Sequence, residues 1–181
     1  MRKCGECTLC CKLLPQVELH KPGGQRCDHQ RMGKGCAIYA RRPPSCRLWN
    51  CRWLVEDDTA DLSRPDRSHY VIDIMPDFVT ARPHDGGPPV HIQVVQVWVD
   101  PNHRDAHRDP QLRAYLARRG EENIAALIRY SETDGFVLAP PAMNDKDEWV
   151  EIRTGVSEHE HSAAEKFAVL GSEVMTKAVL P

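Results

Sequence analysis

Eight cysteines are the residues in this chain of 181 that are best suited to chemistry. All of them lie in the N-terminal third, at Cys4, Cys7, Cys10, Cys11, Cys27, Cys36, Cys46 and Cys51. Two thiolates separated by two residues can turn toward one centre, and Gly5 lets the backbone bend between the first pair. The repeated C-x2-C spacing is therefore a strong indication of a metal site.

The adjacent pair Cys10 and Cys11 suggests more than one metal ion. Neighbouring side chains usually diverge, so this pair favours two centres or a bridging thiolate, and eight thiolates suffice for two four-coordinate sites. Soft thiolates select zinc, copper(I) or iron–sulfur clusters. The opening C-x2-C-x2-C matches the first three ligands of a ferredoxin-type cluster, but the proline-flanked fourth cysteine is missing. The expected cofactor is zinc or iron, with an iron–sulfur cluster as one form.

The surroundings of the cysteines favour metal over disulfides. No apolar run approaches the roughly 18 residues of a membrane helix, and no secretory signal follows Met1. We therefore expect a soluble cytoplasmic protein with no membrane partner. Disulfides rarely persist in a reducing cytosol, whereas metal thiolates do.

Charge divides the chain where the cysteines end. Residues 1–54 carry eleven Lys and Arg against three Asp and Glu, and the rest carries thirteen against twenty-three. We expect a cysteine-rich metal-binding module over residues 1–54 and an acidic α+β domain over residues 55–181. The first region has few large apolar side chains, so a metal or docking onto the second region must supply part of its stability.

The basic balance of the first region is explained most simply by the thiolates. Arg41, Arg42, Arg47 and Arg52 would lower thiol pKa values and offset the negative charge of thiolate sites. Aromatic residues for base stacking are sparse, which weighs against a nucleic-acid partner. Metal ions are the expected partners, and no protein partner is indicated.

Two blocks of residues carry a resemblance to a known family. They are C-G-E-C-T-L-C-C over residues 4–11 and C-A-I-Y-A-R-R-P-P-S-C-R over residues 36–47, with Cys27 between them. This pattern resembles the CxxCxxCC family, whose members are described as zinc- or iron-chelating domains. The resemblance covers roughly residues 4–54 and implies that the eight cysteines are ligands, although many members look to have only seven and lack a counterpart of Cys51.

The same resemblance brings one further expectation. One branch of similar sequences includes flagellin lysine methylases thought to use an iron–sulfur centre, but nothing after Leu54 carries a methyl-donor fingerprint. From the residues themselves, Pro43 and Pro44 stiffen the chain, and Arg42 can donate hydrogen bonds to sulfur or carbonyl groups around the ligands. A direct role for Tyr39 or Arg42 in binding an anionic substrate is the less favoured reading.

The second region is patterned as a mixed domain. Period-two or clustered apolar residues predict strands over 70–74, 78–81, 91–99, 136–139 and 149–153, and a strand or a helix over 124–130. Turns are expected over 85–89 and 131–135. Asp109 and Pro110 should begin a helix that Gly120 ends, and residues 162–178 read as an amphipathic C-terminal helix. The predicted fold class is α+β, with a small irregular cysteine-rich module on an open, largely antiparallel sheet.

The histidines are weaker candidates. His103 and His107 would face one metal on a helix, but the flanking prolines favour a solvated loop. His159 and His161 are given no function. His20 or His29 could replace a thiolate in a site of three cysteines and one histidine.

These observations lead to one leading hypothesis and two alternatives. The leading hypothesis is a cytoplasmic protein that chelates zinc or iron, with a metal whose role could be structural alone. The first alternative is an enzyme with an iron–sulfur or multinuclear iron centre acting on a substrate between the two regions. The second is a zinc-knuckle interaction module for a protein or nucleic acid. Nucleotide-binding and hydrolase motifs are absent from the sequence.

Overall fold

The computed structural model describes residues 2–73, 77–81 and 86–153. Helices and a mixed sheet both form in this part of the chain, which confirms the α+β class at that level. The expected C-terminal helix over 162–178 and the pair His159 and His161 lie outside the described residues. No described helix combines the length and apolar character needed to cross a membrane.

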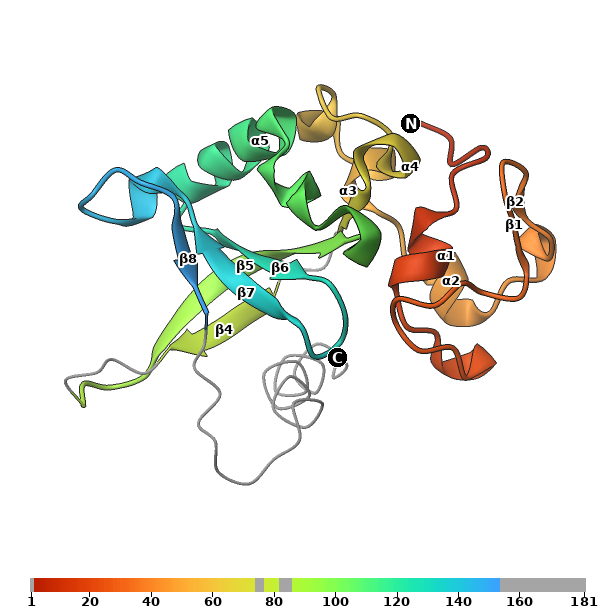
Figure 1. The fold of residues 1–181 in the computed structure, drawn as a ribbon, viewed down its shortest axis with the longest axis horizontal. Helices are drawn as coiled ribbons and strands as arrows, with labels where there is room; N and C mark the ends of the chain where they lie inside the picture. The colour runs from red at the N-terminus through yellow and green to blue at the C-terminus, as the bar shows by residue number, and fades with distance from the viewer. Residues whose placement is uncertain (1, 74–76, 82–85, 154–181) are drawn as a thin grey trace.

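A six-stranded sheet forms the larger part of the molecule (Figure 1). Its strands are β3 (Tyr70–Ile72), β4 (Asp77–Ala81), β5 (Val90–Val99), β6 (Ala125–Arg129), β7 (Gly135–Ala139) and β8 (Val150–Ile152). The order is β3-β5-β6-β7-β8, and β4 pairs with β5 beyond the residues that pair with β3. Only β5 and β6 run parallel among the described strands, so the sheet is largely antiparallel as predicted.

The parallel pair needs a crossover, which the chain makes with two helices, η4 (Pro101–Arg108) and α5 (Pro110–Glu121). The Asp109 carboxylate accepts a hydrogen bond from the Gln111 N–H, so Asp109 caps α5 as expected. The helix ends at Glu121, one residue beyond the predicted end at Gly120. Gly120 is buried inside the helix, where a Cβ would lie 2.5 Å from the Cβ of Pro140. Its small size serves close packing rather than helix termination.

The solvated loop predicted over residues 103–109 is wrong. Residues 101–108 form a 3-10 helix with a kink at His103, and the Asp100 carboxylate caps its start by accepting from the Asn102 N–H. His107 is 4% exposed and packs beside Tyr130 and Phe136. Burial of this one side chain fixes the segment against the sheet.

The two faces of the sheet have different partners, because successive residues of a strand point to opposite sides. One face packs on α5, and this core contains Val95, Val97, Val99, Leu112, Tyr115 and Leu116. On the other face, Val71 and Trp98 pack with Leu9 and Leu13 from the N-terminal part of the chain. The sheet is therefore covered by a helix on one side and, near one end, by the residues that carry the cysteines.

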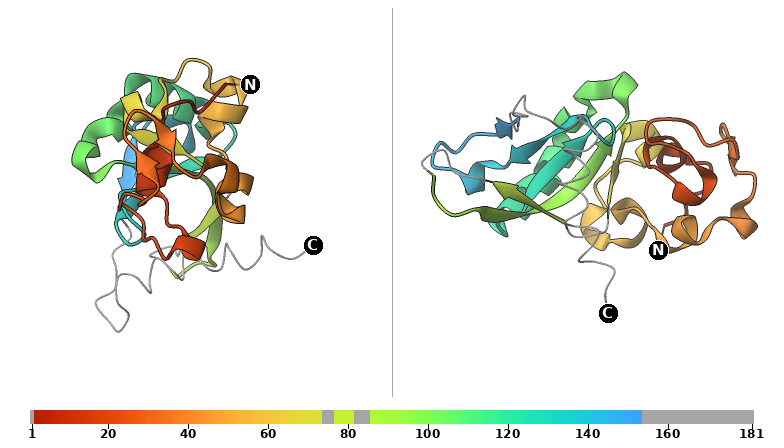
Figure 2. Two further views of the ribbon diagram at one scale, coloured as in Figure 1. Left: turned by 90° about the vertical axis from the view of Figure 1, so that its right-hand side faces the viewer. Right: turned by 90° about the horizontal axis from the view of Figure 1, so that it is seen from below.

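We call residues 2–55 the cysteine segment. It contains short elements joined by irregular chain: α1 (Leu9–Leu13), η1 (Val17–Leu19), β1 (Gln30–Arg31), β2 (Gly35–Cys36), η2 (Tyr39–Arg41), α2 (Pro44–Leu48) and α3 (Arg52–Val55). Further short helices lie at η3 (Asp57–Thr59), α4 (Pro65–Ser68) and η5 (Pro141–Met143). Figure 2 shows the segment gathered at one end of the sheet, so that the molecule is elongated.

Polar contacts join the cysteine segment to the sheet. Lys12 of α1 lies 2.6 Å from both carboxylate oxygens of Asp100, at the end of β5, and both side chains are largely buried. Cys51 forms an isolated antiparallel bridge with Asp73. Together with the apolar contacts of Leu9 and Leu13, these bonds fix α1 and the start of α3 relative to β3 and β5.

Candidate metal centre

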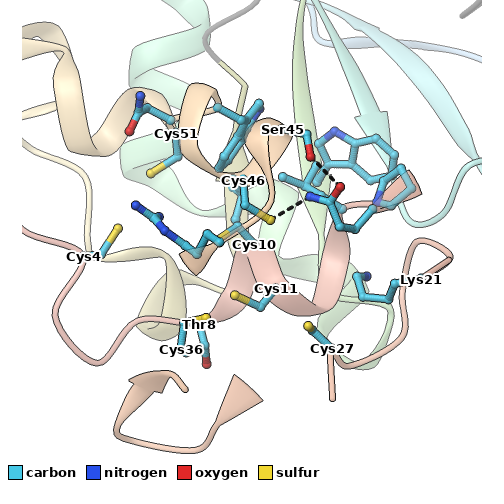
Figure 3. A pocket seen from close by; sticks show the side chains of 18 of the residues that line it. Cys4, Thr8, Cys10, Cys11, Lys21, Cys27, Cys36, Ser45, Cys46 and Cys51 are labelled. Carbon is cyan, nitrogen blue, oxygen red and sulfur yellow. Dashed lines mark hydrogen bonds between the residues drawn. The ribbon is translucent and has the colours of Figure 1, made fainter. Parts of the chain in front are cut away.

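All eight cysteines line one cavity of about 880 Å³. They come from the turn before α1 (Cys4, Cys7), from α1 (Cys10, Cys11), from the following loop (Cys27), from β2 (Cys36), from α2 (Cys46) and from the residue that precedes α3 (Cys51). Figure 3 shows the labelled thiols around this space. None of the eight forms a disulfide. The chain therefore brings every residue of the predicted ligand set to the same place.

Local backbone geometry accounts for part of this convergence. Gly5 has a positive φ of 55°, and the N–H of Cys7 donates to the carbonyl of Cys4 at 3.0 Å, which forms the tight turn expected between the first pair. The N–H of Cys27 donates to the carbonyl of Cys11 at 3.1 Å. This bond places the lone middle cysteine beside α1, although sixteen positions separate the two residues.

The thiols surround a space and do not converge on the position of a single metal ion. Four thiolates on one tetrahedral zinc ion, with Zn–S bonds of about 2.3 Å, would stand only about 3.8 Å from each other. Within the described residues, the only group of three or more His, Cys, Asp or Glu whose ligand atoms all lie within 4.8 Å of one another is His69, Asp100 and His103. No three of the cysteines, all of which are described, therefore meet this spacing.

The electrostatic neighbours of the thiols define two groups. Burial raises the pKa of Cys51 to about 11, and the nearby thiols of Cys4 and Cys7 contribute to the rise. Burial also raises the pKa of Cys46, but there the contributing thiols are Cys11 and Cys27. One neighbourhood thus surrounds Cys51 and the other surrounds Cys46.

Cys10 and Cys11 connect the two neighbourhoods. A hydrogen bond between the two thiols lowers the pKa of Cys11 to about 7 and raises that of Cys10 well above its usual value. Cys7 and Cys4 add to the rise at Cys10, whereas Lys21 and Arg42 add to the lowering at Cys11. The adjacent pair therefore lies between the two groups, and Cys11 also contributes to the raised pKa of Cys4.

A polar chain supports Cys46. Gln16 is 8% exposed, and its Nε2 donates to the Cys46 Sγ at 2.7 Å, the bond drawn to Cys46 in Figure 3. The Ser45 hydroxyl lies 2.5 Å from the Gln16 Oε1 and 2.6 Å from a carboxylate oxygen of Glu18. These contacts orient the Gln16 amide so that its N–H points at sulfur.

Three cationic side chains line the cavity, Lys21, Arg42 and Arg129, and the first two make different contacts. The Lys21 ammonium donates to the carbonyls of Lys12, Pro22 and Gln25. The Arg42 guanidinium lies 3.8 Å from the centre of the Tyr39 ring, and its Nε donates to the Tyr39 carbonyl at 3.0 Å. Lys21 therefore stabilises the loop that leads to Cys27, while the Arg42 side chain is held by the backbone carbonyl and the ring of Tyr39.

The other three arginines that the charge pattern singled out lie away from the thiols. Arg41 and Arg47 are exposed, and Arg52 lies 3.9 Å from Asp58. Within the described residues none of these three lines the cavity, so Arg42 alone meets that expectation. Lys21, Gln16 and the cavity tryptophans were missed by sequence reasoning, because no spacing rule connects them to the cysteines.

The structure places the candidate histidine ligands in different surroundings. His29 lines the cavity, whereas His20 is exposed and is not among the described lining residues. His103 and His107 do not face one metal, because His103 stacks on His69 while His107 is buried beside Tyr130. The 101–108 helix separates the two side chains.

The group of His69, Asp100 and His103 is poorly arranged for a metal. The two imidazole rings are parallel within 6° and 3.6 Å apart, so an ion in the plane of one ring would lie well out of the plane of the other. Both Asp100 oxygens already contact Lys12. We interpret this group as packing around a buried ion pair.

Comparisons with protein-family profiles, with curated proteins and with solved structures find no match to this chain. The resemblance to the CxxCxxCC family therefore rests on the two motif blocks alone. What the site can do must be argued from its own residues.

Proposed function

We propose that the protein binds more than one zinc or iron ion through the eight cysteine thiolates of the cavity. The observation that carries the proposal is that all eight cysteines line a single cavity, although they come from six places in the chain. Thiolates are soft ligands that suit zinc and iron–sulfur clusters. The residues present therefore fit such a group in number and in chemistry.

The spacing of the thiols favours a polynuclear centre over one closed zinc ion. In an iron–sulfur cluster the cysteines bind at the outside of a body of iron and sulfide, so their sulfur atoms stand further apart than around a single ion. The described cysteines enclose a space and do not meet the spacing of a mononuclear site. An iron–sulfur cluster is thus the form of the proposal that the cavity supports best.

The two thiol neighbourhoods suggest how the ligands would divide. Cys4, Cys7, Cys10 and Cys51 would serve one part of the centre, and Cys11, Cys27 and Cys46 the other, with Cys36 and His29 also at the cavity. The centre would supply Lewis-acid or electron-transfer chemistry when bound. Gln16 holds Cys46 in position, and burial keeps water away from Cys51.

The same proposal extends to the organisation of the chain into two regions. The cysteine segment would be a metal-binding module seated on the sheet, working in the reducing cytoplasm, where free thiols persist. The metal would contribute folding free energy to a segment made of short helices and two-residue strands.

Metal analysis tests the proposal directly. The full chain is purified without oxygen, metal and inorganic sulfide are measured per chain, and a visible spectrum is recorded. We expect at least two metal ions per chain, with sulfide and visible absorbance if the centre is an iron–sulfur cluster. Colourless protein with stoichiometric zinc would exclude the cluster, and one metal ion or none per chain would contradict the polynuclear site.

Single cysteine variants test the two neighbourhoods. Cys51→Ser and Cys46→Ser each remove one ligand from a different group, so we expect each to lose part of the metal and to give a different residual spectrum. A matched control variant is not possible, because all eight cysteines line the cavity. The β-sheet signal in circular dichroism therefore serves as the control for folding. Loss of all metal and of all structure in both variants would instead indicate one structural centre.

The cavity also supports the enzyme alternative by its composition. Its walls include residues of the sheet, Val71, Asp73, Gln96, Trp98 and Arg129, which share one face of adjacent strands. A purely structural metal site needs no second wall of this kind.

A further inference from the structure

The cavity is larger than its thiols require. Ligand pockets in proteins measure about 300–1,000 Å³, and this one measures about 880 Å³. The thiols line the part of the cavity formed by the cysteine segment, and residues of the sheet and of the loop between β6 and β7 line the rest. Space for an organic molecule therefore lies next to the candidate metal centre.

Arg42 is placed at the thiol side of this space. Arg42 lines the cavity together with the thiols, and its charge lowers the pKa of Cys4, Cys11 and Cys46, which come from different elements. Stacking on the Tyr39 ring and the bond from Nε to the Tyr39 carbonyl hold it there. An arginine fixed in this way is preorganised for binding.

The two terminal nitrogens of Arg42 have no protein acceptor in the described part of the chain; the Nε bond is the one hydrogen bond that this side chain makes there. Hydrogen bonds to sulfur do occur in the site, since Gln16 donates to Cys46 at 2.7 Å. Arg42 therefore does not use its paired N–H groups on the thiols. A planar pair of donors with no protein acceptor suits a carboxylate or a phosphate, which accept two parallel bonds.

Three tryptophans also line the cavity, and they pack in one cluster with the thiols of Cys7, Cys10 and Cys51. Trp49, Trp53 and Trp98 line the cavity, and the indole N–H groups of the first two are bonded to Asp73 and to the carbonyl of Leu62. These bonds fix the orientation of the rings. Flat apolar surfaces of this kind favour a ligand with an aromatic or other planar apolar body.

We propose that the cavity binds an anionic organic molecule beside the cysteines, with its carboxylate or phosphate on Arg42 and its apolar body against the tryptophans. The proposal deepens the proposed function, because the ligand would be the substrate or co-ligand of the metal centre. Arg42 is thus a binding residue, and Tyr39 positions it.

Matched probes of equal shape test the role of charge. The probes are 1-naphthylacetate and its neutral analogue 1-naphthylacetamide, with 1-naphthyl phosphate to separate the two kinds of anion. Binding to the full chain, purified without oxygen with its metal, is measured by titration calorimetry. We expect at least one anion to bind about tenfold to hundredfold more tightly than the amide, as charge-assisted hydrogen bonds give. The tighter of the two anions identifies the chemical source.

Variants then assign the effect to one residue. Arg42→Gln should lose the preference for the anion while leaving amide binding unchanged, and Arg42→Lys should recover part of it. Arg41→Gln is the control, because Arg41 is the neighbouring residue but is exposed and outside the described cavity lining. Equal affinity for anion and amide in the unaltered protein, or no binding of any probe, would overturn the proposal. So would an equal effect of Arg41→Gln.

Metal content measured on the same samples keeps this test separate from the proposed function. Bound metal without an Arg42-dependent preference for anions would refute the ligand site and leave metal binding intact. Anion preference in protein that holds no metal would support the ligand site and contradict the proposed metal binding. If Arg42→Gln loses metal but keeps the preference, Arg42 serves charge balance alone and the inference is wrong.

Discussion

At the scale of single residues, burial controls the titration of His107. His107 is 4% exposed, and burial lowers its pKa, while Arg113 and Arg108 oppose its charge and Glu151, 3.7 Å away, favours it. Its Nδ1 lies 2.6 Å from the Arg104 carbonyl. The folded protein therefore holds this imidazole in its neutral form at pH 7.

This burial predicts a pH-dependent stability. Below the unfolded pKa of about 6.5 the unfolded chain binds a proton that the folded chain resists, so the free energy of unfolding falls as pH falls. One proton gives a slope of at most about 1.4 kcal/mol per pH unit. Denaturation midpoints between pH 7.5 and 5.5 measure it. His107→Gln should flatten the profile and the exposed control His20→Asn should not; an unchanged slope in His107→Gln would refute the assignment.

The thiols of the site could be predicted from sequence, but the other residues that line the cavity could not. The C-x2-C spacings and the adjacent cysteines identify a ligand set because thiolate chemistry is local and specific. Gln16, Lys21 and Trp98 reach the cavity only through tertiary packing. Nothing in their neighbours along the chain distinguishes them from residues of an ordinary core.

At the scale of elements, α5 and η5 pack more closely than a helix with a full set of side chains would permit. Gly120 of α5 faces Pro140, just before η5. In an exposed helix, replacing glycine by alanine stabilises by up to about 1 kcal/mol. Here the added methyl group would overlap the proline ring.

Gly120→Ala should therefore destabilise the protein by about 1–3 kcal/mol, opposite in sign to helix propensity. Urea denaturation of the metal-free chain measures the change. Ala114→Gly, at an exposed position of the same helix, calibrates propensity alone and should cost about 1 kcal/mol. A stabilising Gly120→Ala would show that η5 moves away at little cost.

The same glycine explains why element boundaries were harder to predict than element types. The strands over 91–99 and 136–139, the cap at Asp109 and the turn after Tyr130 follow from local patterns that tertiary packing reinforces. Glycine is typical of a helix end, but at position 120 it is required by the close approach of Pro140. The 101–108 helix was missed because its stability comes from buried His107 and the Asp100 cap.

At the scale of the whole molecule, one buried ion pair joins the thiol-bearing helix α1 to the sheet. Lys12 and Asp100 are 2.6 Å apart, with side chains 15% and 8% exposed. Removing one partner of such a pair leaves a buried charge unpaired, which typically costs 3–5 kcal/mol, about twice the cost of a lost neutral hydrogen bond.

A double-mutant cycle tests this connection. Lys12→Met and Asp100→Asn should each lower the free energy of unfolding by about 3 kcal/mol, and the double variant should lose much less than the sum. The exposed pair of Arg108 and Asp105 is the control, and its coupling should not exceed about 1 kcal/mol. Additive losses at Lys12 and Asp100 would mean that the pair does not couple the two regions.

Three of the four tryptophans of the chain, Trp49, Trp53 and Trp98, lie around the cavity, and the fourth, Trp149, packs instead against the α5 core and under Arg113. Indole emission from this protein therefore originates mainly at the candidate site. Occupancy of the cavity can be followed by quenching of intrinsic fluorescence, with Trp149 alone as the unquenched remainder. The intrinsic tryptophan fluorescence of the protein therefore reports whether the cysteines have bound a metal centre.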